Sequence, residues 1–311
     1  MVAKYRGSAL ITALFIMTLV AIAATAMSTR LQLDIYRTRL TLTSDKLYLA
    51  SQGVTFWAMN LLSTKITYTL VDEQTGKIAD YPLKLQGVYP GVSSKGALYD
   101  MQGLFNLNSL LDPKSHLVFY NLLKNVLKLN SSTQQKRLIR SIYQWIIPYQ
   151  PDHGQDNELN FYLNQKPAYL PGYQPLKSTS ELRIIQGINT IKYQALLPYV
   201  TVLPEKTLIN INTAPKIILM SLGDGLSETE VDEILQERSK KIKHLNDISL
   251  LLQKLDVPTD QITTESHYFL SISTVRLDNL NLTTYTLLKR GENNKLQPPS
   301  ISIVSEQINT R

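Results

Sequence analysis

The stretch KYRGSALITALFIMTLVAIAATAMSTR, residues 4–30, decides the fold. A short basic opening and one glycine precede an apolar run, Ser8 to Thr29, that contains no charged residue. At 1.5 Å per residue this run spans roughly 30 Å as a helix, which matches the hydrocarbon thickness of a bilayer. The stretch therefore predicts a membrane-spanning helix.

A cleaved secretory signal is the alternative for the same stretch. The apolar core of such a signal is usually about 7 to 15 residues long and is followed by a small-x-small cleavage site. The Ala-x-Ala triplets at 21–23 and 24–26 resemble that site. The length of the run nevertheless favours an anchor that is kept.

Flanking charges and the next segment extend this prediction. Lys4 and Arg6 predict that the amino terminus stays cytoplasmic and that the bulk of the chain is exported, although three arginines beyond the run weaken that orientation. Large apolar residues then recur at helical spacings over residues 33–61, and no proline interrupts residues 1–81. We expect one long helix ending near Ser63, with its first half in lipid or against other helices and its second half on a domain.

Composition excludes several kinds of site. The chain of 311 residues has no cysteine, so it forms neither disulfides nor thiolate metal sites. Its net charge of +7 would suit nucleic acid or anionic lipid, but basic and acidic residues interleave along the chain, which favours a solvated surface. The four histidines have no metal-binding spacing, and the chain has no G-x-S-x-G or phosphate-binding loop. We therefore expect that the chain is not an enzyme.

Two groups of predicted strands bracket a long helical region. The segments ITYTLVDE, YPLKLQGVYP and GALYDMQGLFNL, within residues 66–107, have the composition of short strands. Helical patterns follow, among them HLVFYNLLKNVLKL, STQQKRLIRSIYQWII and STSELRIIQGI. HYFLSISTVRLDNLNLTTYTLLKR and PSISIVSE then return to strand-like alternation. This order predicts one α/β domain whose sheet starts before, and finishes after, a helical insertion.

An Asn-x-Asn pattern followed by a proline occurs twice, in LFNLNSLLDP and in LININTAP. Asparagine side chains accept hydrogen bonds from the exposed N–H groups that begin a helix, and proline is common in an early helical turn. We therefore interpret these asparagines as structural caps rather than as ligands for a bound molecule; they are Asn106, Asn108, Asn210 and Asn212.

Nearly the whole chain resembles the general secretion pathway protein K family, which are minor pseudopilins of the bacterial type II secretion system. The resemblance is carried by RGSALITALFIMT, QGLFNLNSLL, IYQWI, STSELRIIQGI, LPYVTVLPEKTLININTAPKIILMSL and HYFLSISTV, in that order. It implies an α+β fold in which a long N-terminal helix packs on an antiparallel sheet that carries a large inserted all-α domain, SAM-like or helix-hairpin-helix-like. The implied parts are a prepilin leader (1–7), the transmembrane part of the helix (8–29), the first part of the α/β domain (30–107), the inserted helical domain (108–265) and the final strands (266–311).

The resemblance also implies a processing site and a position in a filament. A prepilin peptidase would cut between Gly7 and Ser8 on the cytoplasmic side, and Ser8 would become N-methylated. Most pilin-like subunits carry a glutamate at the fifth position of the mature chain, where this chain has Thr12. A subunit without that carboxylate has no buried charge to pair with a subunit above it. The implied protein is an inner-membrane, single-pass subunit with a periplasmic globular domain, at the pseudopilus tip with minor pseudopilins I and J, without nucleic acid.

Calcium is the cofactor that the resemblance implies. Relatives bind it through oxygen clusters in a loop where this chain has QWIIPYQPDHGQDNELNFY, with Ile147 and Pro148 at positions where acids are expected. Asp152, Asp156 and Glu158 are the candidate ligands here. A solvated loop without metal is the alternative.

A membrane-anchored DNA receptor is the alternative function. Residues 212–252 resemble a helix-hairpin-helix module, whose Gly-x-Gly turn presents backbone N–H groups to a DNA phosphate. Asp224, between Gly223 and Gly225, puts a carboxylate where the phosphate would approach, and the next helix begins with acidic residues. These charges favour contact with protein.

Overall fold

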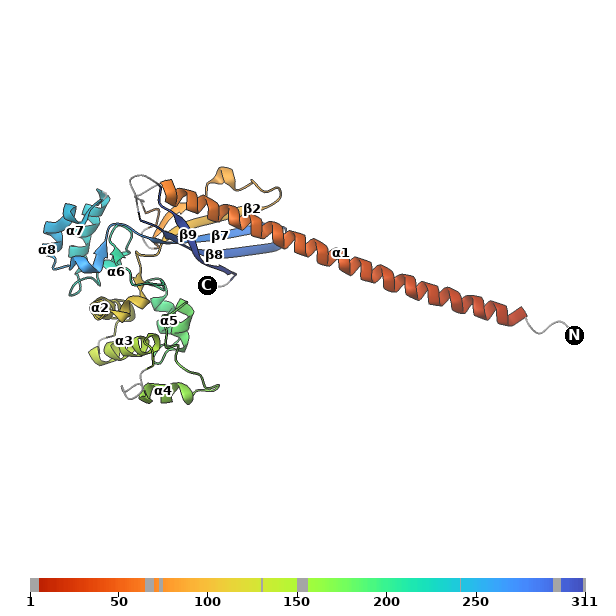
Figure 1. The fold of residues 1–311 in the computed structure, drawn as a ribbon, viewed down its shortest axis with the longest axis horizontal. Helices are drawn as coiled ribbons and strands as arrows, with labels where there is room; N and C mark the ends of the chain where they lie inside the picture. The colour runs from red at the N-terminus through yellow and green to blue at the C-terminus, as the bar shows by residue number, and fades with distance from the viewer. Residues whose placement is uncertain are drawn as a thin grey trace.

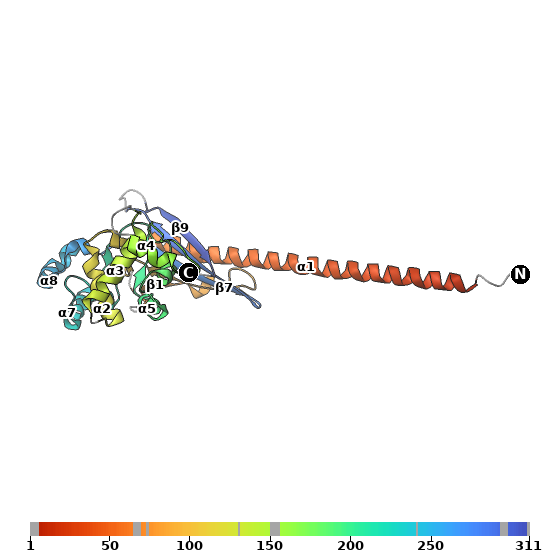
Figure 2. The ribbon, with the colours of Figure 1, turned by 90° about the horizontal axis from the view of Figure 1, so that it is seen from below.

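The computed structural model describes residues 6–64, 70–72, 75–129, 131–149, 156–240, 242–292 and 298–309. One long helix, α1 (Arg6–Thr64), projects as a rod from a globular part that surrounds its carboxyl end (Figure 1). The view turned by 90° shows the same rod, with the remaining helices gathered at the end of the molecule opposite the amino terminus (Figure 2). The prediction of one uninterrupted helix ending near Ser63 is confirmed.

A five-stranded antiparallel sheet lies under the last part of α1, in the order β1-β2-β7-β8-β9. Its strands are β1 (Lys77–Asp80), β2 (Ser93–Asp100), β7 (Tyr268–Leu277), β8 (Leu280–Arg290) and β9 (Ile301–Ile308). The β7–β8 hairpin turns at Asp278-Asn279, and Asp278 has a φ of 53°, as a two-residue hairpin turn requires.

The helical part of the chain is inserted between two neighbouring strands. β2 and β7 pair along their whole length, and Asp100 at the end of β2 stands opposite Phe269 at the start of β7. The chain between them leaves the sheet and returns to the same place. The fold-class prediction of a long helix on an antiparallel sheet with a helical insertion is therefore confirmed.

The insertion contains seven α-helices, short 3₁₀ turns and two pairs of very short parallel strands among the described residues. The helices are α2 (Ser115–Leu127), α3 (Ser132–Ile146), α4 (Asp156–Leu163), α5 (Thr190–Leu196), α6 (Lys216–Leu219), α7 (Glu228–Ser239) and α8 (Ser249–Lys254). The strand pairs are β3 (Phe105–Asn106) with β4 (Val200–Thr201), and β5 (Ile209–Asn210) with β6 (Ile262–Thr263). One hydrophobic core, running from Phe105 to Ile262, holds the insertion together, whereas three smaller clusters lie around the sheet.

One predicted strand is wrong in type. YPLKLQGVYP, residues 81–90, forms a 3₁₀ turn (Leu83–Leu85) and bends instead of a strand, because Pro82 cannot donate to a ladder. The helical prediction for STSELRIIQGI is confirmed, and the helix there is a 3₁₀ helix (Thr179–Ile184). Most of ITYTLVDE lies outside the described residues; its residues 70–72 form no strand. The actual first strand is the short β1.

The face of α1 that contacts the sheet is built from small residues as well as large ones. Leu47 and Val54 are buried, as the apolar pattern predicts, but Leu33 and Tyr36 remain more than half exposed because they lie before the sheet begins. The buried positions recur every three or four residues; they are Leu47, Ala50, Ser51, Val54, Thr55, Ala58 and Leu62. Small side chains at four of these positions, Ala50, Ser51, Thr55 and Ala58, let the helix axis lie close to the strands.

Gly96 on β2 supplies the other half of this close approach. A Cβ atom at Gly96 would lie 2.3 Å from Cγ1 of Val54 and 3.0 Å from the carbonyl oxygen of Ile272. Val54 is fully buried and β-branched, so it has little freedom to move away. The glycine is required by the helix–sheet contact.

We expect Gly96→Ala to lower the free energy of unfolding by roughly 1–3 kcal/mol, because the added methyl group overpacks this contact. The matched control is Gly87→Ala, since a Cβ at Gly87 meets no atom within 4 Å. Urea unfolding of the two variants, followed by tryptophan fluorescence, measures the difference. Equal stability of the two variants would show that α1 does not depend on this contact.

Candidate functional site

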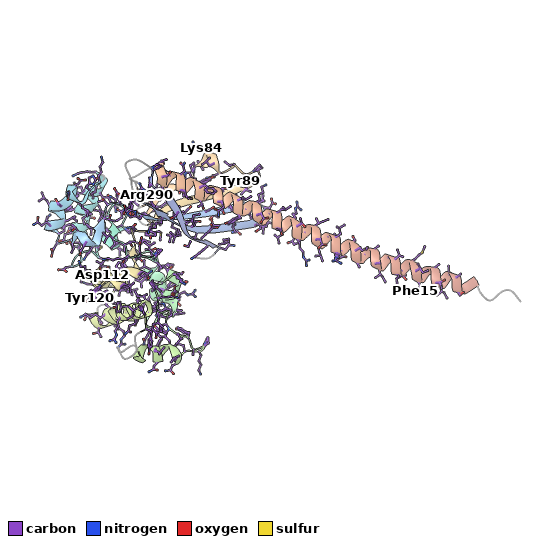
Figure 3. All side chains as sticks on the ribbon, in the orientation of Figure 1. Phe15, Lys84, Tyr89, Asp112, Tyr120 and Arg290 are labelled. Carbon is purple, nitrogen blue, oxygen red and sulfur yellow. The ribbon has the colours of Figure 1, made fainter. Side chains whose placement is uncertain are left out.

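The amino-terminal part of α1 is an apolar surface without a covering layer. Every residue from 8 to 42 is exposed, and Phe15, 66% exposed, projects from the rod far from the globular part (Figure 3). Among the described residues, α1 is the one helix long and apolar enough to cross a membrane. It fits a single-pass anchor.

The predicted processing residues lie at the start of this helix. Gly7 and Ser8 are in the first turns of α1, and Met1 to Tyr5 lie outside the described residues. The hydroxyl of Thr12 donates to the carbonyl oxygens of Ser8 (3.1 Å) and Ala9 (3.0 Å). The polar group at this position is thus satisfied within its own helix and needs no partner from another chain.

A stripe of large apolar residues follows the outer face of α1, opposite the sheet. Ile35, Leu42, Leu49 and Phe56 recur every seven residues and are 59%, 64%, 57% and 63% exposed. Because seven residues make about two helical turns, these side chains line up along one face. We call these four residues the outer stripe; it continues the apolar surface of the anchor onto the globular part.

The edge of the sheet next to α1 is also apolar and exposed. β9 is an edge strand on which Ile303 and Ile308 are nearly half exposed. Gln52 of α1 donates to both carboxylate oxygens of Glu306 on β9 at 3.1 Å, which fixes the edge beside the helix. The outer stripe and the β9 edge are therefore two neighbouring surfaces on which another chain can pack.

A buried carboxylate ties the insertion to the sheet. Oδ2 of Asp100 accepts hydrogen bonds from Asn210 Nδ2 (3.0 Å), Thr213 Oγ1 (2.7 Å) and Ser266 Oγ (2.7 Å). Its Oδ1 accepts one from the backbone N–H of Gln102 (2.9 Å). Burial raises the pKa of Asp100, and the four hydrogen bonds oppose that shift. Because the backbone N–H of Gln102 and the amide NH₂ of Asn210 can only donate, both carboxyl oxygens of Asp100 act as acceptors in this network.

The four asparagines of the repeated pattern are structural. Asn106 accepts a hydrogen bond from the N–H of Asn108 at 3.1 Å and caps the 3₁₀ helix Leu107–Leu111, so the capping interpretation is confirmed for Asn106. Asn210 accepts the same local bond from Asn212 at 3.0 Å, but the helix that follows, α6, has Pro215 at its N-cap. Their amide groups also reach across the fold: Asn108 donates to the carbonyls of Leu176 and Leu203. The local pattern gives no sign of these distant partners.

The helix-hairpin-helix-like turn uses its own N–H groups internally. Gly223 donates its backbone N–H to Oε1 of Gln261 (3.0 Å), and Gly225 donates to the carbonyl of Leu222 (2.9 Å). Both glycines have positive φ angles, so the turn has the expected shape. The donors that would hold a DNA phosphate are already occupied.

The structure does not describe the side chains of the candidate calcium ligands. Asp152 lies outside the described residues, and Asp156 and Glu158 are in the first turns of α4, with side chains that are not described. Elsewhere in the described chain, no three His, Asp or Glu side chains gather closely enough to hold a metal ion. Calcium binding stays a prediction.

Comparison with known proteins settles the family. Two family models, both described as type II secretion system protein K, match residues 103–205 and 209–267. The putative type II secretion system protein K of Escherichia coli K12 is 31% identical over 254 residues, which is 76% of each chain. The chain belongs to the type II secretion system protein K family. The protein K of Aeromonas hydrophila is 26% identical over 322 residues and covers 93% of this chain and 94% of its own.

The fold agrees with a solved member of the same family. The chain is similar to the crystal structure of the GspK–GspI–GspJ complex from enterotoxigenic Escherichia coli, with a TM-score of 0.69 and 23% identity, over 88% of this chain and 100% of that chain. The predicted resemblance to the protein K family is confirmed. The alternative of a DNA receptor gains no support from these relatives.

The role of Asp100 could not be predicted from the sequence, because its partners Asn210, Thr213 and Ser266 are all more than a hundred residues away in the chain.

We expect Asp100→Asn to lower the free energy of unfolding by roughly 2–3 kcal/mol, because one donor would then face the new NH₂ group in a buried site. Asp80→Asn is the control: Asp80 is 58% exposed and pairs with Lys77 at 3.2 Å, so its loss should cost less than about 1 kcal/mol. Urea unfolding measures both variants. Equal costs would contradict the role assigned to Asp100.

Proposed function

We propose that this chain is a minor pseudopilin that occupies the tip of a type II secretion pseudopilus, where it begins and caps the filament. Its globular part lies in the periplasm, its α1 helix anchors it in the inner membrane before assembly, and its role is structural rather than catalytic. The single observation that carries the tip position is the insertion, which lies at the carboxyl end of α1, with α7 and α8 beyond that end and α4 and α5 to one side of it (Figure 1). A subunit stacked above would have to occupy that space.

Thr12 supports the same position. In a filament of packed helices, a carboxylate at this depth is costly unless it meets an opposite charge. Thr12 is neutral and bonded within its own helix, so α1 can be the uppermost helix without leaving an unpaired charge. The chain can begin a filament and has no electrostatic need for a neighbour above.

The outer stripe and the β9 edge are the surfaces proposed to bind minor pseudopilins I and J. Leu49 and Phe56 of the outer stripe, and Ile303 and Ile308 of β9, are exposed on the globular part, where neither lipid nor the packed anchor helices would cover them. The similar solved structure is a complex of this kind. Complex formation would cover the face of α1 that the sheet leaves open.

Processing is tested by mass spectrometry of the mature amino terminus. We expect the prepilin peptidase to cut between Gly7 and Ser8, so that the protein starts at methylated Ser8. Gly7→Leu should keep the leader, whereas Gly87→Leu, on a loop far from the cut, should be processed normally. A start after Ala23 or Ala26 would replace the anchor with a cleaved signal and a soluble exported protein.

The contact surface is tested by multi-angle light scattering of the three mixed globular domains. We expect a one-to-one-to-one complex, and we expect Leu49→Glu with Phe56→Glu to weaken it at least about tenfold, because burial of such side chains is worth roughly 1.5–3 kcal/mol each. Leu250→Glu is the control, since Leu250 on α8 is 82% exposed and far from the outer stripe. Absence of a ternary species, or equal effects of both variants, would contradict this assembly.

A further inference from the structure

An open apolar groove lies between α2 and α3 on the insertion. It has a volume of about 550 Å³, and its apolar lining includes Leu117 and Tyr120 of α2 and Ile139 and Tyr143 of α3. Volumes of this size are typical of sites that bury a compact apolar group. Leu117 is 42% exposed, so the groove opens to solvent.

The wall of the groove is fixed before anything binds. A ring nitrogen of His116 lies 2.8 Å from the carbonyl oxygen of Leu110, and the His116 ring stands edge-on to Tyr143 with a centroid distance of 5.7 Å. Ile139 is 92% buried against the core below. A partner would therefore meet a preformed surface and would not have to order it.

The helices that form the groove contain basic residues and no acidic ones. The segment 113–149 contains six Lys or Arg and no Asp or Glu, so its net charge is +6. The expectation that basic and acidic residues interleave along the chain is wrong for this segment. Lys136 and Arg140 lie on the rim of the groove itself.

Several of these cations have no internal counter-charge. Lys114 pairs with Asp260 at 2.7 Å, but Lys124, Lys136 and Arg137 are exposed and form no ion pair with any residue that the structure describes. Charges that a fold leaves without counter-charges produce a local positive potential that attracts acidic partners. Such a potential surrounds the apolar groove on the α3 side.

The shape and position of the site favour protein over lipid or nucleic acid. Tyr120 lies on the side of the insertion that faces away from α1, at the opposite end of the molecule from the anchor, so the anchoring membrane does not reach it (Figure 3). Nucleic acid binds chiefly through its phosphates and would leave an apolar groove unfilled. A protein segment with an apolar side chain and neighbouring carboxylates satisfies both the groove and its rim.

We propose that the groove between α2 and α3 is a docking site for an acidic protein segment that inserts an aromatic or leucine side chain between Leu117 and Tyr143. Carboxylates on either side of that anchor pair with Lys136 and its basic neighbours. This site is independent of the proposed tip position, because it uses neither the outer stripe nor the β9 edge.

The test measures binding of a short fluorescent peptide, with a central Trp-Leu pair flanked by Asp and Glu, to the full chain in a neutral detergent. Fluorescence anisotropy should show saturable binding that weakens as salt is raised. A peptide of the same length with Asn and Gln in place of the acids should bind at least about tenfold more weakly. Hydrogen exchange should show protection by the acidic peptide in residues 115–146.

Two charge-introducing variants locate the site. Leu117→Glu should weaken peptide binding at least about tenfold, and Lys136→Glu about threefold. The matched controls are Leu83→Glu and Lys84→Glu, an exposed leucine and lysine on the turn after β1, which should leave binding unchanged. Since Lys136 is exposed, its replacement leaves the fold intact even if Leu117→Glu destabilises it.

Three results would overturn the proposal. The neutral peptide could bind as tightly as the acidic one, Lys136→Glu could leave the affinity unchanged, or protection could fall outside α2 and α3. Phosphatidylglycerol vesicles and duplex DNA are run in parallel as competitors. Displacement of the peptide by either one, with loss of that binding in Lys136→Glu, would assign the basic surface to lipid or to nucleic acid instead.

Discussion

The close contact between the last part of α1 and the sheet is the constraint on which the rest of the structure depends. Gly96 and the small residues Ala50 and Ala58 let the helix lie directly on the strands, which fixes which side chains of α1 face the sheet and which face solvent. The same register that buries Val54 turns Leu49 and Phe56 outward. The surface proposed for assembly is thus a geometric consequence of how the helix is held.

The insertion leaves the sheet after β2 and returns to it at β7, so a further contact must hold it against the sheet. Asp100 provides that contact by accepting hydrogen bonds from residues in three separate parts of the chain. A buried carboxylate costs several kcal/mol in desolvation, which is offset when every lone pair has a donor. The four hydrogen bonds that offset this cost for Asp100 also tie the helical insertion to the sheet.

The parts of the fold that follow from local periodicity could be predicted, and the parts that depend on distant contacts could not. The long helix and the bracketing strands follow from hydrophobic spacing, and the Asn106 cap and the local bond between Asn210 and Asn212 follow from neighbouring residues. The five-stranded order, the partners of Asp100 and the groove between α2 and α3 depend on which elements meet in space. Leu117 and Tyr143 lie on different helices, and neither helix alone indicates a site.

The uncharged apolar surface of the molecule lies along α1, and the basic groove lies at the opposite end. Assembly through α1 therefore leaves the basic groove exposed. The outer stripe carries no charge, as suits packing against other apolar helices, where a cation would have to be desolvated. The basic residues of α2 and α3 gather instead at the end away from the anchor, beside an apolar groove that no residue of the chain fills among those described. A subunit that packs against its neighbours along α1 therefore still presents this end to other proteins. The groove is apolar and its rim is cationic, so it favours acidic partners, whereas the outer stripe favours uncharged apolar helices.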